Sequence, residues 1–160
     1  MRWIWIDKFL EFEVGKRAVA VKSVTLAEDH LHDHFPGYPV MPASLLIEGM
    51  AQTGGILVGQ ARGFRKKVVL AKISKAVFYD LVLPGMQIHL EAVIENLAEE
   101  GASIRGTIRT GDKVIAEMAL MYSHIDKNMG GIEFPEENFV FNERFMNLFK
   151  HYLPDDTGAC

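Results

Sequence analysis

Two side chains in this sequence, His34 and Glu48, could remove and deliver protons in one reaction. Between His34 and Arg62 the only charged residue is Glu48, in a run that is otherwise apolar, small or neutral. A carboxyl group in such surroundings loses solvation on folding, and this loss favours its protonated form, which can donate a proton. An imidazole titrates near ~6.5 and can accept a proton at neutral pH. These residue types suit a base at His34 and an acid at Glu48.

A structural interpretation of the same two residues stands beside the chemical one. His34 can be a loop histidine that hydrogen-bonds to the backbone, and Glu48 can be a buried polar anchor. The spacing of the pair does not decide between these interpretations.

The stretch between residues 35 and 42 contains three prolines and one glycine, which interrupt regular structure and predict a rigid, irregular loop after His34. Pro42 suits the first turn of a helix, where its missing N–H costs nothing. We therefore expect one buried helix over residues 43–61, with its end marked by Gly63.

One face of this predicted helix is polar, because Ser44, Glu48 and Gln52 follow one another at intervals of four residues. Several small residues leave room for close packing against a neighbouring element, namely Ala51, Gly54, Gly55 and Gly59. Glycines are costly in an isolated helix, so packing must hold this one. A sheet wrapped around the helix would provide that packing.

The segments on either side of the helix have β-strand patterns. Residues 8–14 and 17–24 are predicted to form a hairpin around Gly15 and Lys16. Residues 27–33 are rich in charge and histidine and have no apolar periodicity, so we expect a loop that leads into His34.

After the helix, residues 68–79 are rich in β-forming residues. Residues 86–97, 103–109 and 113–125 alternate in character and are separated by short turns, which predicts an antiparallel meander. A short β unit, a long buried helix and a long antiparallel run together indicate the α+β class.

The C-terminal part has a different pattern. Residues 126–135 include Gly130 and Gly131 and are interpreted as a linker. Asn142 can cap a final amphipathic helix that carries Phe145, Phe149 and Tyr152 on one face. Such an aromatic face most often covers a core or a subunit contact. We therefore predict a domain over residues 1–125 and an extension over residues 126–160 that packs on the domain or on a neighbouring subunit.

Composition limits the possible partners and location. The 160 residues are 49% hydrophobic and 24% charged, which fits one globular domain with a tail. The net charge of -4 argues against nucleic acid as the main partner. The single cysteine, Cys160, cannot form an internal disulfide, and no export signal or membrane-spanning run is visible. We expect a soluble, cytoplasmic protein with no membrane partner.

The run HFPGYPVMPASLLIEGMAQ, residues 34–52, resembles the active-site segment of bacterial 3-hydroxyacyl-[acyl-carrier-protein] dehydratases. The resemblance extends more loosely over residues 6–125. It implies a hotdog fold, a long antiparallel sheet wrapped around a central helix, assembled as a homodimer or a trimer of dimers. It also implies an active site at the dimer interface, beside a tunnel for the acyl chain, and no cofactor.

By this similarity, His34 would abstract the C2 proton of a (3R)-3-hydroxyacyl thioester, and Glu48 of the other subunit would protonate the departing hydroxyl. The substrate would be carried on the phosphopantetheine of acyl carrier protein. The reaction also requires a donor that polarises the thioester carbonyl, and N–H groups at a helix start can do this. In the related dehydratases a glycine supplies this donor, and here the position holds Ala43.

Three neighbouring residues are expected to support this site. Gly37 and Tyr38 would shape the pocket, and Gln52 would orient the Glu48 carboxyl. The simpler interpretation of these residues is loop geometry or helix packing. A methyl group at Ala43 would obstruct the site if the position required a positive φ or very close approach of the substrate.

Three rival interpretations remain open at this point. Histidines and aspartates between Asp29 and His34 could bind a divalent metal if alternate side chains of an extended loop converged; these are His30, His32, His34, Asp29 and Asp33. Our preferred interpretation includes no metal. The chain could instead be a non-catalytic acyl-thioester binder, such as one subunit of a hetero-oligomer, or a hotdog thioesterase.

A basic patch directly follows the predicted helix in this acidic protein: Arg62, Arg65, Lys66 and Lys67. Most such runs are solvated surface. We hypothesise that this patch docks acidic acyl carrier protein, or the phosphate of its phosphopantetheine, near the tunnel mouth.

Overall fold

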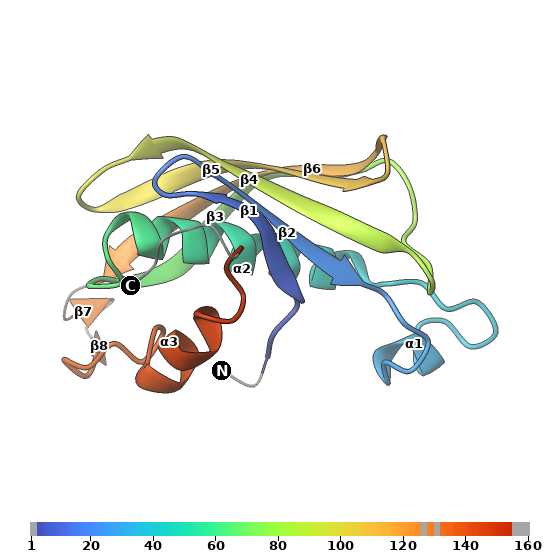
Figure 1. The fold of residues 1–160 in the computed structure, drawn as a ribbon, viewed down its shortest axis with the longest axis horizontal. Helices are drawn as coiled ribbons and strands as arrows, with labels where there is room; N and C mark the ends of the chain where they lie inside the picture. Colours follow the sequence, from blue (N-terminus) through green and yellow to red (C-terminus); the bar gives the residue numbers. More distant parts are fainter. Residues whose placement is uncertain (1–2, 126–127, 130–131, 155–160) are drawn as a thin grey trace.

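The computed structural model describes residues 3–125, 128–129 and 132–154. In this part of the chain a six-stranded antiparallel sheet, in the order β1-β2-β4-β5-β6-β3, curves around the long helix α2 (Figure 1). The strands are β1 (Lys8–Glu13), β2 (Arg17–Ser23), β3 (Lys67–Phe78), β4 (Gln87–Leu97), β5 (Gly101–Thr110) and β6 (Lys113–Ile125), and the helix is α2 (Ala43–Ala61). The predicted α+β class and hotdog fold are confirmed.

The predicted hairpin and meander are both present, as β1–β2 and β4–β5–β6. One prediction was wrong: the segment before His34 contains a one-turn helix, α1 (His30–Asp33), whose Leu31 is buried. A single inward-facing leucine is too little apolar periodicity to indicate a helix from sequence. After α2 the chain crosses to the far edge of the sheet, because β3 pairs only with β6 among the described strands.

Helix α2 begins after Pro42 and ends before Gly63, as these two residues predicted. Pro42 is its N-cap, with an extended ψ of 136°, and Gly63 follows it with a φ of +60°. The helix packs very closely on the sheet at Gly54. A Cβ atom there would lie 2.5 Å from Ile104 Cδ1 and 2.6 Å from the Tyr122 hydroxyl oxygen. The close approach of helix and sheet therefore requires a residue without a side chain at this position.

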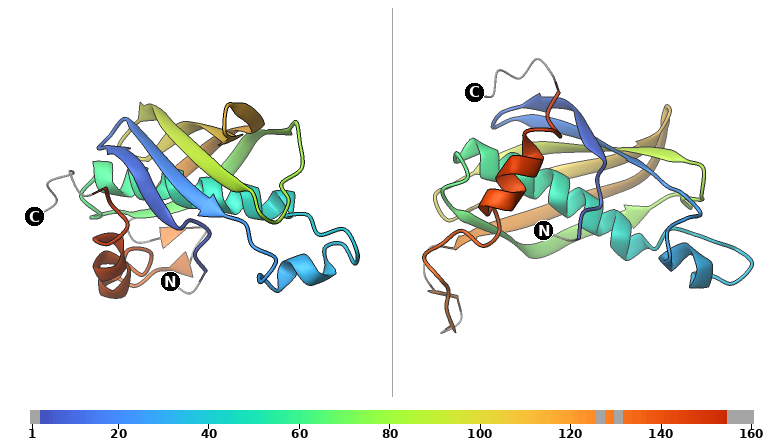
Figure 2. Two further views of the ribbon diagram at one scale, coloured as in Figure 1. Left: turned by 45° about the vertical axis from the view of Figure 1, so that its right-hand side comes forward. Right: turned by 60° about the horizontal axis from the view of Figure 1, so that its bottom comes forward.

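The C-terminal extension forms a third layer on α2, on the side away from the sheet (Figure 2). Its described part contains the short antiparallel pair β7 (Asn128–Met129) and β8 (Ile132–Glu133), which lies within the predicted linker, and the helix α3 (Glu143–Phe149). The Asn142 side chain accepts a hydrogen bond from the Phe145 N–H (2.9 Å), which confirms the predicted cap.

The buried side of α3 is aromatic, and Phe145 and Phe149 belong to the main core cluster. Two features of the sequence analysis lie outside the described residues: the glycine pair of the predicted linker, Gly130 and Gly131, and the single cysteine, Cys160. The domain boundary at residue 125 stays a prediction. None of the helices in the described ranges is long and apolar enough to cross a bilayer.

We predict opposite effects of alanine at two adjacent glycines of α2. Gly54→Ala should lower the free energy of unfolding by about 1–3 kcal/mol, because the new methyl group meets Ile104 and the Tyr122 hydroxyl. Gly55→Ala should leave it unchanged or raise it by up to about 1 kcal/mol, because its Cβ would lie 3.5 Å from the nearest Tyr122 atom and alanine favours helix.

Chemical denaturation of the two variants and of the wild type at one protein concentration measures this difference. Both substitutions add the same methyl group to neighbouring helical positions, so helix propensity cancels in the comparison. Equal stability of the two variants would contradict the close packing at Gly54.

Candidate active site

The Glu48 carboxylate is half-buried on α2 and is held by a neighbouring side chain one turn along the helix. Its Oε1 atom accepts a hydrogen bond from Gln52 Nε2 (2.8 Å). The same amide donates to the Trp3 carbonyl (2.7 Å), and Gln52 Oε1 accepts from the Trp5 N–H (2.9 Å). Gln52 therefore ties the carboxylate to the segment that precedes β1, and these contacts fix the orientation of the amide.

A cavity of about 180 Å³ lies beside Glu48. Its other walls come from α2, β3, β6 and the C-terminal extension: Ala51, Gln52, Gly55, Ile56, Val68, Leu70, Tyr122, Val140 and Phe141. Apart from Glu48, Gln52 and the Tyr122 hydroxyl, these side chains are apolar. The cavity thus offers one carboxylate in an otherwise largely apolar wall, which can bind an apolar chain beside an acid.

Tyr122 is a polar member of this wall that the sequence reasoning missed. Its hydroxyl donates a hydrogen bond to the Ala51 carbonyl (2.8 Å). Burial, with a further contribution from the nearby Glu48 charge, raises the pKa of Tyr122 far above its usual range, so the phenol stays protonated. The signal for its position was the alternation of β6, in which Met118, Leu120 and Tyr122 are all buried.

His34 lies in the loop between α1 and α2, in a turn of defined shape. Its ring stacks on Phe35 with centroids 4.1 Å apart, and its carbonyl accepts a hydrogen bond from the Val40 N–H (2.8 Å). Phe35 and Tyr38 exchange two backbone hydrogen bonds of 3.0 and 2.9 Å, and Gly37 between them has a φ of +78°. Gly37 therefore permits the turn, while Tyr38 points outward with 55% of its surface exposed.

One chain does not bring all the predicted site residues into one cavity. The Glu48 cavity contains Gln52, but His34, Gly37 and Tyr38 are absent from its described lining residues. Ala43 is the first residue of α2 and is exposed, so its N–H lies at the positive end of the helix dipole. Its φ is not positive, since Phe64 is the one non-glycine residue with a positive φ in the described ranges. The methyl group therefore causes no backbone strain.

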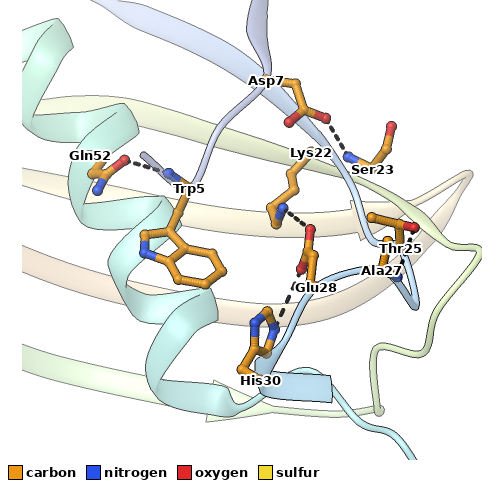
Figure 3. A network of polar contacts seen from close by, with 9 residues as sticks. All are labelled: Trp5, Asp7, Lys22, Ser23, Thr25, Ala27, Glu28, His30 and Gln52. Atoms are coloured by element: carbon orange, nitrogen blue, oxygen red, sulfur yellow. Dashed lines mark hydrogen bonds and ion pairs between the residues drawn. The ribbon is translucent and has the colours of Figure 1, made fainter. Parts of the chain in front are cut away.

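The short helix α1, which leads into His34, is anchored by a network around Trp5 (Figure 3). Lys22 is buried and pairs with Glu28 (2.6 Å), and its ammonium lies 5.5 Å from the centre of the Trp5 ring. His30 of α1 lies with its Nε2 3.4 Å from Glu28 and its ring 5.2 Å from the Trp5 ring. Because the Trp5 backbone also binds Gln52, one segment supports both the Glu48 side and the His34 side.

His30, His32 and His34 do not converge on a common point. His30 lies against Trp5 and Glu28, His32 Nε2 lies 2.9 Å from the Leu26 carbonyl, and His34 stacks on Phe35. Among the described residues, no group of three or more histidine, cysteine, aspartate or glutamate side chains is arranged to hold a metal ion. The geometry that the metal hypothesis required is not formed here.

The basic residues after α2 are engaged in contacts around the β4–β5 turn and the extension. Arg62 donates to the Ala98 carbonyl (2.8 Å), and Arg65 donates to the Arg62 carbonyl (3.2 Å). Lys66 pairs with Glu99 (2.9 Å), and this hydrogen bond lowers the pKa of the Glu99 carboxyl. Lys67 is only 4% exposed and donates to the Glu136 carbonyl (3.2 Å). Arg65 is the most accessible member of this patch.

Relatives of this chain are dehydratases. It is 41% identical over 119 residues to the 3-hydroxyacyl-[acyl-carrier-protein] dehydratase FabZ of Hydrogenobaculum sp., an alignment that covers 72% of this chain and 80% of that protein. It is 37% identical over 122 residues to the enzyme of the same name from Pelotomaculum thermopropionicum, with 76% and 87% covered. Such dehydratases are hydro-lyases. The resemblance seen in residues 34–52 is therefore confirmed.

Solved structures at lower identity share the fold. The conserved protein PA5202 of Pseudomonas aeruginosa has a TM-score of 0.62 at 19% identity, covering 74% of this chain and 87% of that chain. The dehydratase heterocomplex ApeI:P of Xenorhabdus doucetiae gives 0.63 at 16% identity, with 78% and 84% covered. Residues 3–119 match the FabA-like domain, and the chain belongs to this hotdog family.

Proposed function

We propose that this protein dehydrates (3R)-3-hydroxyacyl thioesters of acyl carrier protein in fatty acid biosynthesis, with His34 as base and Glu48 as acid. The observation that carries the proposal is the Glu48 carboxylate, held by Gln52 in a largely apolar cavity, in a chain whose relatives are dehydratases. A cytoplasmic location, where acyl carrier protein is found, forms part of the same proposal.

The proposed reaction is an elimination of water. His34 takes the C2 proton, and the electrons of that C–H bond form the new C2–C3 double bond. The C3–O bond breaks, and the leaving hydroxyl takes a proton from Glu48, so that the products are a trans-2-enoyl thioester and water. Gln52 is assigned a positioning role, because its amide donates directly to the carboxylate. Gly37 and Tyr38 are assigned to the loop that holds His34.

We propose that the site is completed by a second copy of the chain, in a homodimer or a trimer of dimers. Strand β3 lies at the edge of the sheet, and residues 70–75 are all exposed, including Leu70 (39%) and Ile73 (45%). Val68 and Leu70 of this edge strand also line the Glu48 cavity. Pairing at this edge would cover apolar surface next to the cavity and could bring in His34 of the other subunit.

The central prediction concerns the acid and the base. His34→Ala and Glu48→Gln should each lower kcat for hydration of crotonyl thioesters and for the reverse dehydration by roughly 10²-fold or more, the usual contribution of a positioned acid or base. Loss of enoyl-thioester absorbance measures hydration, and its gain measures dehydration. His32→Ala, which changes an exposed histidine two residues away, should retain activity and serves as the control.

Mixing the two inactive variants tests whether the site is shared between subunits. A mixed dimer would contain one site with both His34 and Glu48 intact, so random exchange should restore about one quarter of the wild-type activity. No restoration would refute a shared site. A wild-type protein that is folded, inert and able to bind acyl thioesters would support the alternative of a non-catalytic binder.

We also propose that the Ala43 N–H polarises the thioester carbonyl, and a proline tests this donor. Proline is favoured at the first helical position, and Pro42 already has the extended ψ that a following proline requires. Ala43→Pro should therefore preserve the fold but lower kcat by about 10²–10³-fold, the usual loss of one oxyanion donor.

Ala43→Gly keeps the N–H and should retain activity, which makes it the matched control. Circular dichroism and the thermal midpoint establish that the Ala43→Pro variant is folded. Full activity of a folded Ala43→Pro protein would remove the N–H from the mechanism.

For carrier-protein docking we propose a surface centred on Arg62, Arg65 and Lys66, and the burial of Lys67 gives it no docking role. Arg65→Glu should raise KM for carrier-protein substrates by roughly threefold to tenfold, in line with ~1 kcal/mol for one exposed charge. KM for short pantetheine thioesters should stay unchanged. Arg109→Glu, an exposed reversal near the β5–β6 turn, is the control, and equal effects on both substrate types would contradict docking.

A further inference from the structure

Part of the wall of the Glu48 cavity comes from the C-terminal extension. Val140 and Phe141 line this cavity together with Ile56 of α2 and Leu70 of β3. The match to the FabA-like domain ends at residue 119, so these two side chains lie outside the matched region. The size of the cavity in this chain is thus set partly by residues that the matched domain does not supply.

Asn138 fixes the segment that carries this wall. Its Nδ2 donates to the carbonyls of Phe64 (2.9 Å) and Lys66 (3.2 Å) in the loop after α2. Its Oδ1 accepts from the N–H groups of Val140 (3.1 Å) and Phe141 (3.0 Å). One side chain therefore links the extension to the loop after α2 by two hydrogen bonds and holds the backbone of Val140 and Phe141 by two more, which defines the position of these two residues.

The Phe141 ring fits into a notch on α2. A Cβ atom at Gly59 would lie 2.6 Å from two atoms of this ring, so the ring occupies the space that a side chain there would fill. Phe141 is 8% exposed, and its ring centre lies 4.8 Å from that of Phe64 and 5.2 Å from that of Phe145. The ring cannot leave the cavity wall without unpacking this aromatic cluster.

The helix behind the wall is also attached at its far end. Phe145 and Phe149 of α3 are buried against the domain, and the Tyr152 carbonyl accepts a hydrogen bond from the Phe9 N–H of β1 (2.8 Å). The extension thus crosses α2 from the start of β3 to β1 and is held at both ends. The extension is therefore a fixed part of the cavity wall.

We propose that Val140 and Phe141 determine the acyl-chain length that this enzyme accepts. The inference rests on the proposed function, in which the C3 hydroxyl of the substrate lies at Glu48. From there the acyl chain continues along the apolar side of the cavity, toward Ile56, Leu70, Val140 and Phe141. Because the extension is fixed, its side chains limit the space for carbons farther from the thioester.

Substitutions at Val140 test this in both directions. Val140 is half-buried, so Val140→Ala enlarges the cavity and Val140→Phe fills it with little change elsewhere. The substrates are 3-hydroxyacyl thioesters of four to sixteen carbons, and the measured quantity is kcat/KM for the long chains divided by kcat/KM for the short ones. Val140→Ala should raise this ratio by roughly tenfold, and Val140→Phe should lower it by a similar factor. This is the usual effect of pocket volume on selectivity. Phe141→Ala should act like Val140→Ala, although it also unpacks the ring from Gly59.

Phe139→Ala is the matched control. It removes a 45% exposed ring from the same segment, and Phe139 is not among the described residues that line the cavity. Its chain-length profile should match the wild type. If the wild type is active and both Val140 variants keep the wild-type profile, the inference is overturned while the proposed function stands.

A second measurement separates the inference from the proposed function. If the wild type dehydrates none of the thioesters, the proposed function fails, and calorimetric binding of saturated acyl-pantetheine thioesters of the same lengths decides the inference. A shift of the longest bound chain upward in Val140→Ala and downward in Val140→Phe supports it. An unshifted limit, or no binding of any chain, overturns it.

Discussion

The close contact between α2 and the sheet is the constraint on which the rest of this structure depends. Where Gly54 faces the side chains of Ile104 and Tyr122, the helix contributes no side chain of its own to the space between the two layers. Beside this contact the Tyr122 hydroxyl donates to the Ala51 carbonyl, and the Glu48 and Gln52 side chains of the same helix line the cavity. The glycine thus allows the helix that carries the Glu48 carboxylate to lie close to the sheet.

A second level of organisation is the segment that precedes β1. The backbone of Trp3 and Trp5 binds Gln52, which in turn holds Glu48, while the indole of Trp5 contacts both Lys22 and His30. Glu48, the proposed acid, and the loop that carries His34, the proposed base, therefore share one support within the chain. Because this support is formed within one chain, the proposed dimer would only have to bring the His34 loop of one copy next to Glu48 of the other.

The parts of the fold that the sequence predicted are those with strong local signals. Pro42 and Gly63 marked the ends of α2, and Asn142 marked the start of α3. Features that depend on distant contacts were missed. The short helix α1 buries only Leu31, which is too weak a pattern to recognise. The position of β3 at the far edge of the sheet depends on its pairing with β6, a strand distant in the sequence. Within the site, Glu48 and Gln52 were predicted together because helical spacing relates them, whereas the wall residues Tyr122, Val140 and Phe141 come from other elements.

The notch at Gly59 makes a residue of the domain and a residue of the extension depend on each other. A Cβ atom at Gly59 would lie 2.6 Å from the Phe141 ring and 3.0 Å from Phe64 Cδ1, so the Phe141 ring sets the tightest limit there and packs well only while the glycine remains. Neither position can change alone without a gap or a clash. In homologues without such an extension, a larger residue at this point of the helix would fill the notch, so this pair should vary together during evolution.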